Sequence, residues 1–367
     1  MRIVFYAPRA SHLKPGESGD RVFVRDLLAA LQERGHQVDI ASLLDVRDFW
    51  RGRVPTRRLV TEAISVYRAI KRSSPDAWLV FNSSMTCPDF FGWWQKPKRY
   101  VLFKTDAGTT EALPRAWRWP FALAHRRSLA RADKIVAERP KSASQLRSIG
   151  VEDERLSILP LAVRTWDSIP SREAARRHLE LPPEAPIVLC VSRLTAANDH
   201  RTAWKTEAVL ELVQALALLP SELMLVLVGD GPGRERVEER VADLKLGARV
   251  RYAGAIANDA VRWFYAACDF FAYPTLNERM LNVMLEAQAC GRPVVAMRNR
   301  STELIIDDGR TGLLAQDREE LQAHLLALAS DRARCQAMGE AGPQYIARSH
   351  SMQARVQQIE DMLVGQC

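Results

Sequence analysis

The chain reads Asn277-Glu278-Arg279-Met280-Leu281-Asn282-Val283-Met284-Leu285-Glu286-Ala287 at the point that decides its fold. Glu278 ends a strand-like run that begins at Asp269, and Glu286 lies two helical turns further on, inside an apolar run. A carboxylate just before a helix and another two turns into it can face the same edge of a sheet. Open α/β sheets bind ligands at the carboxyl ends of their strands. Carboxylates there suit sugar or ribose hydroxyls, and the N–H groups of a helix start suit phosphate.

Strand and helix signals alternate along the whole chain, which favours parallel, doubly wound sheets. A proline-rich stretch between Pro160 and Pro186 predicts a boundary between two domains, over residues 1–166 and 167–342. The length of 367 residues suits two such domains. Strands are predicted over residues 1–7, 38–41, 77–81, 100–103, 134–137, 156–159, 187–191, 223–228, 250–253, 269–273 and 293–296.

The charge is uneven along the chain. Residues 1–166 carry 29 Lys and Arg against 17 Asp and Glu, a net charge of +12, and the remainder carries a net charge of −4. Basic and aromatic residues interleave between Arg115 and Arg127 and again between Arg57 and Arg72. This pattern indicates an anionic partner such as a membrane surface, a lipid phosphate or an acidic glycan. Ordinary arginine-rich composition with snorkelling side chains is the alternative, and no nucleic-acid-binding motif is present.

The six cysteines are scattered, without a Cys-x-x-Cys pair, so buried reduced thiols are expected. No apolar run approaches the length of a membrane span, and the first residues read as a strand rather than a signal peptide. We therefore expect a cytoplasmic protein, with peripheral contact on the inner face of the membrane as a further hypothesis. Isolated histidines with no ligand spacing predict no metal site.

Two further segments extend the pattern around the glutamates, namely Cys290-Gly291-Arg292-Pro293-Val294-Val295-Ala296 and Asp308-Gly309-Arg310-Thr311-Gly312-Leu313-Leu314. On these residues the chain resembles retaining, nucleotide-sugar-dependent glycosyltransferases of family 4. The resemblance implies the GT-B fold, in which two Rossmann-like domains face a central cleft. It implies an acceptor domain over residues 1–166, a donor domain over 167–342, and a C-terminal helix in 343–367 that packs back on the first domain.

The resemblance also implies a donor site in the second domain. Arg193, after a predicted strand, and Lys205, at the start of a helix, would hold the nucleotide diphosphate, whose charge grows as the glycosidic bond breaks. Arg201 is a rival for Lys205, because the loop is longer than usual and Thr206 replaces the family's glycine. Fixed cations could replace a metal in this role, so neither a metal nor another cofactor is expected.

In the same site, the resemblance implies that Glu286 accepts hydrogen bonds from the ribose and Glu278 from the donor sugar. Backbone amides of Met280, Leu281 and Asn282 would meet the sugar or phosphate. The run Val228-Gly229-Asp230-Gly231-Pro232-Gly233 predicts a tight turn at Gly229 and Gly231, and the resemblance implies that this turn lies near the nucleotide. A purely structural turn is an equally good interpretation of these glycines.

In the first domain, Gly19 and Asp20 take the place of the family's glycine loop, where Gly19 could bring amides near the donor phosphate. Lys104-Thr105-Asp106 stands where many relatives carry a His-Asp pair, so Asp106 is the candidate for orienting or deprotonating the acceptor hydroxyl. A helix N-cap or loop aspartate is the alternative.

The leading hypothesis is a retaining glycosyltransferase of hexosyltransferase type. It would move a sugar from a nucleotide diphosphate sugar, with UDP favoured, to a hydroxyl of a glycan, a lipid-linked sugar or a small molecule. One alternative is a GT-B nucleotide-sugar epimerase. The other is a catalytically silent GT-B protein that binds a glycan or a partner.

Overall fold

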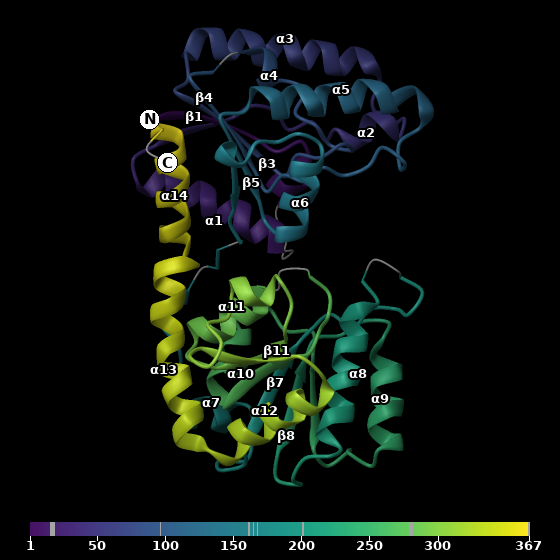
Figure 1. Ribbon diagram of the computed structural model, residues 1–367, viewed down its shortest axis with the longest axis vertical. Coiled ribbons are helices and arrows are strands. Elements are labelled where there is room, and N and C mark those ends of the chain that lie inside the picture. The colour runs from purple at the N-terminus through teal and green to yellow at the C-terminus, as the bar shows by residue number, and fades with distance from the viewer. Residues whose placement is uncertain are drawn as a thin grey trace. The chain divides into compact units, whose positions relative to one another are not determined.

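The computed structural model describes residues 1–14, 19–95, 97–160, 162–163, 165–166, 168–199, 202–278 and 282–365. The chain forms two compact units (Figure 1). Unit 1 comprises Met1–Leu161 with Met352–Cys367, and unit 2 comprises Ala162–Ser351. The structure thus divides the chain at 161/162 and 351/352, five residues before the predicted boundary at 166/167 and nine residues after the one at 342/343.

Unit 1 is built on a six-stranded parallel sheet in the order β2-β1-β3-β4-β5-β6. All six strands were predicted from the sequence. The strands are β1 (Arg2–Tyr6), β2 (Gln37–Ile40), β3 (Ala77–Phe81), β4 (Arg99–Phe103), β5 (Lys134–Ala137) and β6 (Leu156–Ile158). The helices are η1 (Ala10–Leu13), α1 (Gly19–Glu33), α2 (Arg47–Trp50), α3 (Thr56–Ser73), α4 (Gly92–Gln95), α5 (Arg115–Arg131), α6 (Pro140–Ser148), η2 (Asp153–Arg155) and α14 (Met352–Val364).

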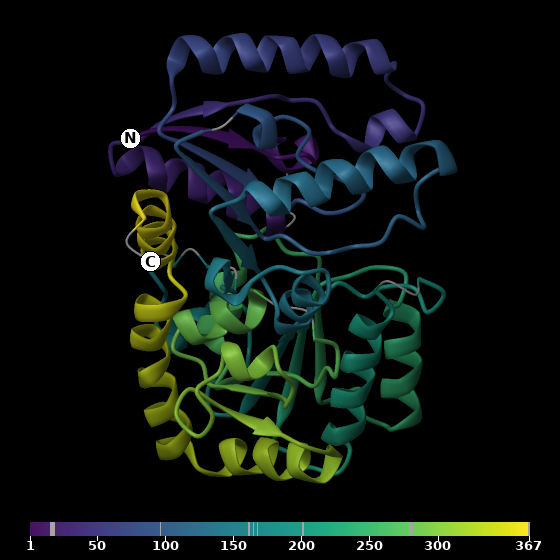
Figure 2. The ribbon, with the colours of Figure 1, turned by 45° about the horizontal axis from the view of Figure 1, so that its top comes forward.

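Unit 2 is a second six-stranded parallel sheet, in the order β12-β11-β10-β7-β8-β9, with α8 and α9 side by side (Figure 2). The strands are β7 (Ile187–Val191), β8 (Met224–Val228), β9 (Val250–Gly254), β10 (Phe270–Tyr273), β11 (Val294–Met297) and β12 (Gly312–Ala315). The helices are α7 (Arg172–His178), α8 (Trp204–Leu216), α9 (Arg234–Asp243), α10 (Val261–Ala267), α11 (Asn282–Ala289), η3 (Thr302–Leu304), α12 (Arg318–Ser330) and α13 (Arg332–Ser349). Strand β12 was not predicted from the sequence.

The central strands are buried on both faces, as parallel sheets covered by helices require. Every residue of β3 and of β10 is buried, and the strand residues are mostly apolar with no polar alternation. These runs are short, apolar and rich in aromatic residues, which explains why their positions could be predicted from the sequence.

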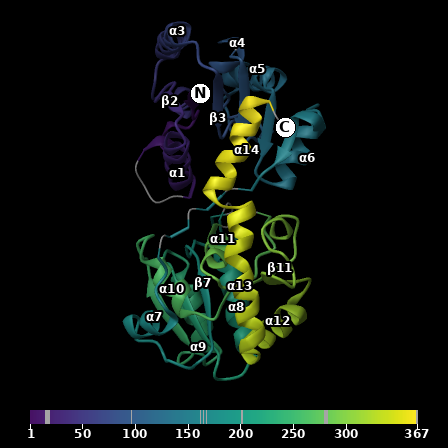
Figure 3. The same ribbon diagram turned by 90° about the vertical axis from the view of Figure 1, so that its left-hand side faces the viewer.

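The C-terminal segment corrects one expectation. It forms two helices, α13 and α14, rather than one helix over residues 343–364 (Figure 3). The break falls at His350–Ser351, where the backbone N–H of Val163 donates to the carbonyl of His350 at 2.9 Å. Helix α14 packs on α1 and β4 of unit 1, and Arg34 Nε donates to Glu360 Oε1 at 2.8 Å.

A buried aspartate organises one edge of unit 1. The carboxylate of Asp89, which has no exposed surface, accepts four hydrogen bonds. Two come from the Trp78 Nε1–H and the Tyr100 hydroxyl, each at 2.8 Å, and two from the backbone N–H groups of Phe91 and Gly92, at 2.7 and 2.9 Å. All these donors are buried, so the carboxylate is fully compensated and has a structural role.

Candidate functional site

In unit 2 the strand order reverses between β7 and β10, which are neighbours in the sheet but not in the chain. Loops leaving two such strands diverge, and the crevice between them is where open α/β sheets bind ligands. Arg193 follows β7 and Glu278 follows β10. The structure therefore brings two of the predicted donor residues to the switch point of this sheet.

The loops after β7 and β8 are joined by backbone hydrogen bonds. Ser192 N–H donates to Val228 O at 2.9 Å, and Leu194 N–H donates to Asp230 O at 3.1 Å. Gly229 and Gly231 have φ values of 125° and 142°, and a Cβ on them would lie 1.9 and 2.1 Å from the carbonyl oxygens of Ser192 and Leu194. Only glycine fits this close approach, so the turn has a structural reason for both glycines, whether or not it also contacts a ligand.

Thr206, which departs from the family's glycine, fixes the start of α8. Its hydroxyl accepts from Thr195 N–H at 2.7 Å and donates to Thr195 O at 2.8 Å. Lys205, next to it, is half-buried with its Nζ 5.6 Å from the Trp204 ring centre. Arg193 is exposed. Arg201, the rival of Lys205, lies outside the described residues, so that choice stays open.

The loop that carries Glu278 is held by the loop after β11. The Ser301 hydroxyl donates to the backbone carbonyl of Glu278 at 2.7 Å, and Asn299 Nδ2 donates to Thr275 O at 3.3 Å. Asn299 Oδ1 accepts in turn from the backbone N–H groups of Ser301 and Thr302, at 2.9 and 3.1 Å. These supporting residues were not predicted from the sequence, although an Asn-x-Ser-Thr run after a strand is a recognisable turn signal.

Glu286 lies on α11 with its Oε2 accepting a hydrogen bond from the Tyr265 hydroxyl at 2.9 Å. Burial raises the pKa of Glu286, and the hydrogen bond from Tyr265 opposes that rise only in part. Asn282 is the first residue of α11. Met280 and Leu281 lie outside the described residues.

In unit 1 a group of charged side chains gathers at the carboxyl ends of the strands. Lys104, after β4, pairs with Asp20 of α1 and with Glu138 after β5, the latter at 3.1 Å between Nζ and Oε2. His12 Nε2 lies 3.6 Å from Asp20 Oδ2. Burial opposes ionisation of Asp20, but the charge and hydrogen bond of Lys104 outweigh it and lower the pKa of Asp20. Asp20 therefore forms an ion pair with Lys104. Gly19, the other residue predicted for this loop, is the first residue of α1.

Asp106 lies in the loop after β4, half-buried, with its backbone N–H donating to Ser83 O at 3.2 Å. The next helix, α5, begins only at Arg115, so Asp106 does not cap it. Burial raises the pKa of Asp106, against the opposing charges of Arg139, Arg9 and Lys104. The carboxyl group of Asp106 therefore lies near three positively charged side chains that were not predicted from any sequence motif.

Within the described ranges, no three His, Cys, Asp or Glu side chains gather closely enough to hold a metal ion. The five cysteines of those ranges are unpaired and buried. None of the helices formed by the described residues is long and apolar enough to cross a membrane.

Part of the chain matches a known family of glycosyltransferases. Residues 185–331 match the sequence model of the family described as Glycosyl transferases group 1. The whole chain superposes on an Anabaena protein, HepE, solved in complex with UDP, with a TM-score of 0.71, 17% identity and complete coverage of both chains. Together with the two parallel sheets, the superposition shows the GT-B fold, and the match over residues 185–331 makes the chain similar to glycosyltransferases.

Two curated glycosyltransferases are similar to the chain in sequence. The lipopolysaccharide core biosynthesis glycosyltransferase LpsE of Rhizobium meliloti is 26% identical over 94% of this chain and 96% of its own length. The D-inositol 3-phosphate glycosyltransferase of Acidothermus cellulolyticus is 34% identical over 51% of this chain, a match that spans 43% of that relative. The resemblance to glycosyltransferases is thus confirmed, and the assignment to family 4 in particular stays a prediction.

Proposed function

We propose that the chain is a retaining glycosyltransferase that transfers a hexose from a nucleotide diphosphate sugar to a hydroxyl group. The observation that carries the proposal is the placement of Arg193 and Glu278 at the β7/β10 switch point, with Glu286 on the helix that follows β10. An exposed arginine at the end of a strand is available to a diphosphate. Carboxylates at the same edge are available to the hydroxyls of a ribose and a sugar.

In the proposed reaction Arg193 and Lys205 stabilise the charge that develops on the leaving diphosphate. Glu278 accepts hydrogen bonds from the donor sugar, and Glu286 from the ribose. Gly229, Gly231 and the start of α11 shape the wall of the site. The loop of Glu278 is fixed by Ser301 and is therefore preorganised for this role.

UDP is the nucleotide we favour, because the Anabaena relative was solved with UDP and with UDP-glucose. No metal or other cofactor is part of the proposal. Asp106 is our candidate for orienting or deprotonating the acceptor hydroxyl, since a carboxyl with a raised pKa is a better proton acceptor than an ordinary one. The acceptor is a glycan, a lipid-linked sugar or a small molecule.

The nucleotide site can be tested by thermal shift with UDP, GDP and ADP in the absence of metal. At a ligand concentration of about 100 Kd, binding should stabilise the fold by about 2.7 kcal/mol. The shift in melting temperature should disappear in Arg193→Ala and Glu286→Ala. It should persist in the control variants Arg240→Ala and Glu239→Ala, which remove one positive and one negative charge from α9. A chain that responds to no nucleotide would overturn the proposal.

Transfer is the second part of the test. UDP-sugars are incubated with acceptors, and the anomeric configuration of the product is read by NMR. A product with retained anomeric configuration supports the mechanism. Glu278→Ala should abolish transfer while the melting temperature stays unchanged. Nucleotide binding without transfer would favour the silent binding protein, and a changed sugar without an acceptor would favour the epimerase.

We also propose that unit 1 contacts an anionic membrane surface from the cytoplasmic side. Helix α3 exposes Val60 and Ile64, one turn apart, beside Arg57, Arg68 and Lys71. Apolar side chains among cations suit an interfacial helix. Flotation with vesicles containing phosphatidylglycerol should recover the wild type and not Arg57→Glu/Arg68→Glu, and equal recovery by neutral vesicles would refute the electrostatic contact.

A further inference from the structure

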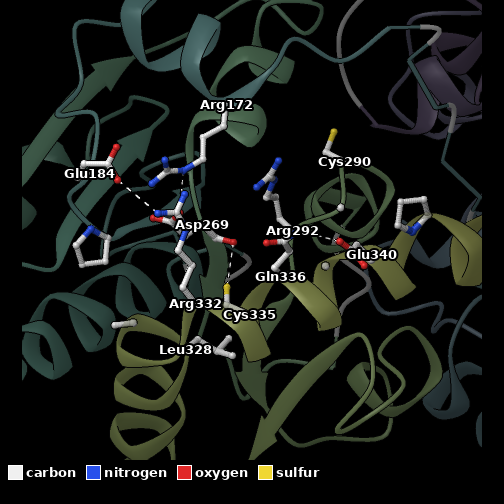
Figure 4. Close-up of a pocket in the computed structure, with 15 residues that line it drawn as sticks. Arg172, Glu184, Asp269, Cys290, Arg292, Leu328, Arg332, Cys335, Gln336 and Glu340 are labelled. Atoms are coloured by element: carbon white, nitrogen blue, oxygen red, sulfur yellow. Dashed lines mark hydrogen bonds and ion pairs between the residues drawn. The ribbon is translucent and has the colours of Figure 1, made fainter.

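Unit 2 contains a pocket of about 670 Å³, away from the candidate donor residues (Figure 4). Among its lining residues, Pro186 and Asp269 immediately precede β7 and β10, and Arg292 lies two residues before the first residue of β11. The pocket therefore lies at the amino ends of these strands, whereas the candidate donor residues lie at the carboxyl ends. Its volume is in the range of small-molecule sites.

One side of the pocket is a fixed ionic network. The Asp269 carboxylate accepts from Arg172 Nε at 3.1 Å, from Arg176 Nη2 at 2.8 Å and from Ile187 N–H at 2.7 Å. Two arginines thus share one carboxylate and leave an excess positive charge beside the pocket. At the rim, Arg332 and Glu184 form a long, exposed pair at 3.4 Å and add no net charge.

Arg292 is the lining cation that is left available. Its Nη1 donates to the backbone carbonyl of Cys268 at 3.1 Å, and its Nε is buried without a hydrogen-bond partner. Within the part of the chain that the structure describes, no carboxylate forms an ion pair with it. Glu340, the remaining acidic group of the lining, accepts from Gln336 Nε2 at 2.9 Å.

Apolar residues make up the rest of the lining. Leu328, Ala329 and Pro343 come from α12 and α13, and Cys290 and Cys335 add two buried thiols. Burial raises the pKa of both thiols, to about 12 for Cys335, so they are neutral at physiological pH.

From this combination we infer that the pocket binds a small organic anion, with an apolar body of acyl-chain or ring size and one anionic head group on Arg292. An arginine without a carboxylate partner, beside apolar residues, suits such a ligand, since the head group receives charge-assisted hydrogen bonds and the body leaves water. The inference does not depend on the proposed transferase activity, because no residue of the candidate donor site lines this pocket.

Isothermal titration of the full chain with sodium octanoate tests the inference, with octylammonium as the probe of opposite charge. We expect saturable binding of octanoate at one site and markedly weaker binding of octylammonium. Arg292→Gln should weaken octanoate binding about tenfold or more, the size of one charge-assisted hydrogen bond. Arg240→Gln, on α9, is the matched control and should bind like the wild type.

A second variant covers the case in which Arg292→Gln folds poorly. Gln336 is exposed on the pocket wall, and Gln336→Trp should fill the space and abolish octanoate binding at an unchanged melting temperature. Three results would overturn the inference: no saturable binding to the wild type, equal affinity for octylammonium, or affinity unchanged in the folded pocket variants.

Discussion

Replacing Gly229 by alanine tests whether the turn between β8 and α9 is a structural requirement of unit 2. The new Cβ would lie 1.9 Å from Ser192 O, whereas real Cβ atoms essentially never come within 3.0 Å of another atom. The loops must therefore separate, which breaks the hydrogen bond from Ser192 N–H to Val228 O. The φ of 125° adds a backbone penalty for any residue with a Cβ.

The loss of stability can be estimated from the backbone penalty and the lost hydrogen bonds. A non-glycine residue in such a conformation costs about 1–3 kcal/mol, and each lost backbone hydrogen bond costs about 0.5–1.5 kcal/mol. With one or two hydrogen bonds lost, Gly229→Ala should destabilise the chain by about 1.5–6 kcal/mol. In a unit of this size that corresponds to a fall in Tm of roughly 10 °C.

Gly247→Ala is the matched control, because a Cβ there meets nothing within 4 Å. Both variants are compared with the wild type by urea denaturation and calorimetry, and UDP affinity is then measured on the folded fraction. A Gly229→Ala variant within about 0.5 kcal/mol of the wild type would refute the reasoning, since the close approach would then be relieved without cost.

Three further perturbations follow from the described contacts. Thr206→Val removes both hydrogen bonds to Thr195 and should cost about 2 kcal/mol in urea denaturation, with no loss expected if water replaces them. Asp89→Ala leaves four buried donors unpaired and should cost about 3–5 kcal/mol, and a soluble variant with wild-type Tm would contradict this. Burial lowers the pKa of both His12 and His125 from 6.5 to about 4, so the unfolded chain binds more protons below pH 6.5. Stability should fall as pH falls from about 6.5 to 4, by up to about 1.4 kcal/mol per pH unit and histidine, and His125→Leu should flatten that slope in calorimetry from pH 7 to 5.

The fold could be predicted largely because buried parallel strands have a local signature. The apolar runs at Ala77–Phe81 and Ile187–Val191 were predicted with the bounds that the structure has. Strand β12 was missed because Gly312–Ala315 is short and contains no β-branched residue. The break between α13 and α14 was missed, and the hydrogen bond recorded at that break comes from Val163, which is remote in sequence.

In the candidate site, some residues could be predicted from the sequence and the contacts that position them could not. Arg193, Glu278 and Glu286 could be proposed because the motifs around them resemble those of family 4 glycosyltransferases and follow predictable strands. The contacts that position them could not, because Ser301 reaches the carbonyl of Glu278 across 23 positions of sequence. Lys104 likewise meets Asp20 across 84 positions, and no local pattern encodes such a pair.

The division of unit 1 into two chain segments has a consequence for synthesis. Helix α14 covers α1 and β4, yet it is translated after all of Ala162–Ser351. Unit 2 is continuous in sequence and needs no later segment, but unit 1 must wait for α14 with part of its core uncovered. A nascent or truncated chain that lacks α14 is therefore expected to recruit chaperones through unit 1, and early proteolysis should begin there.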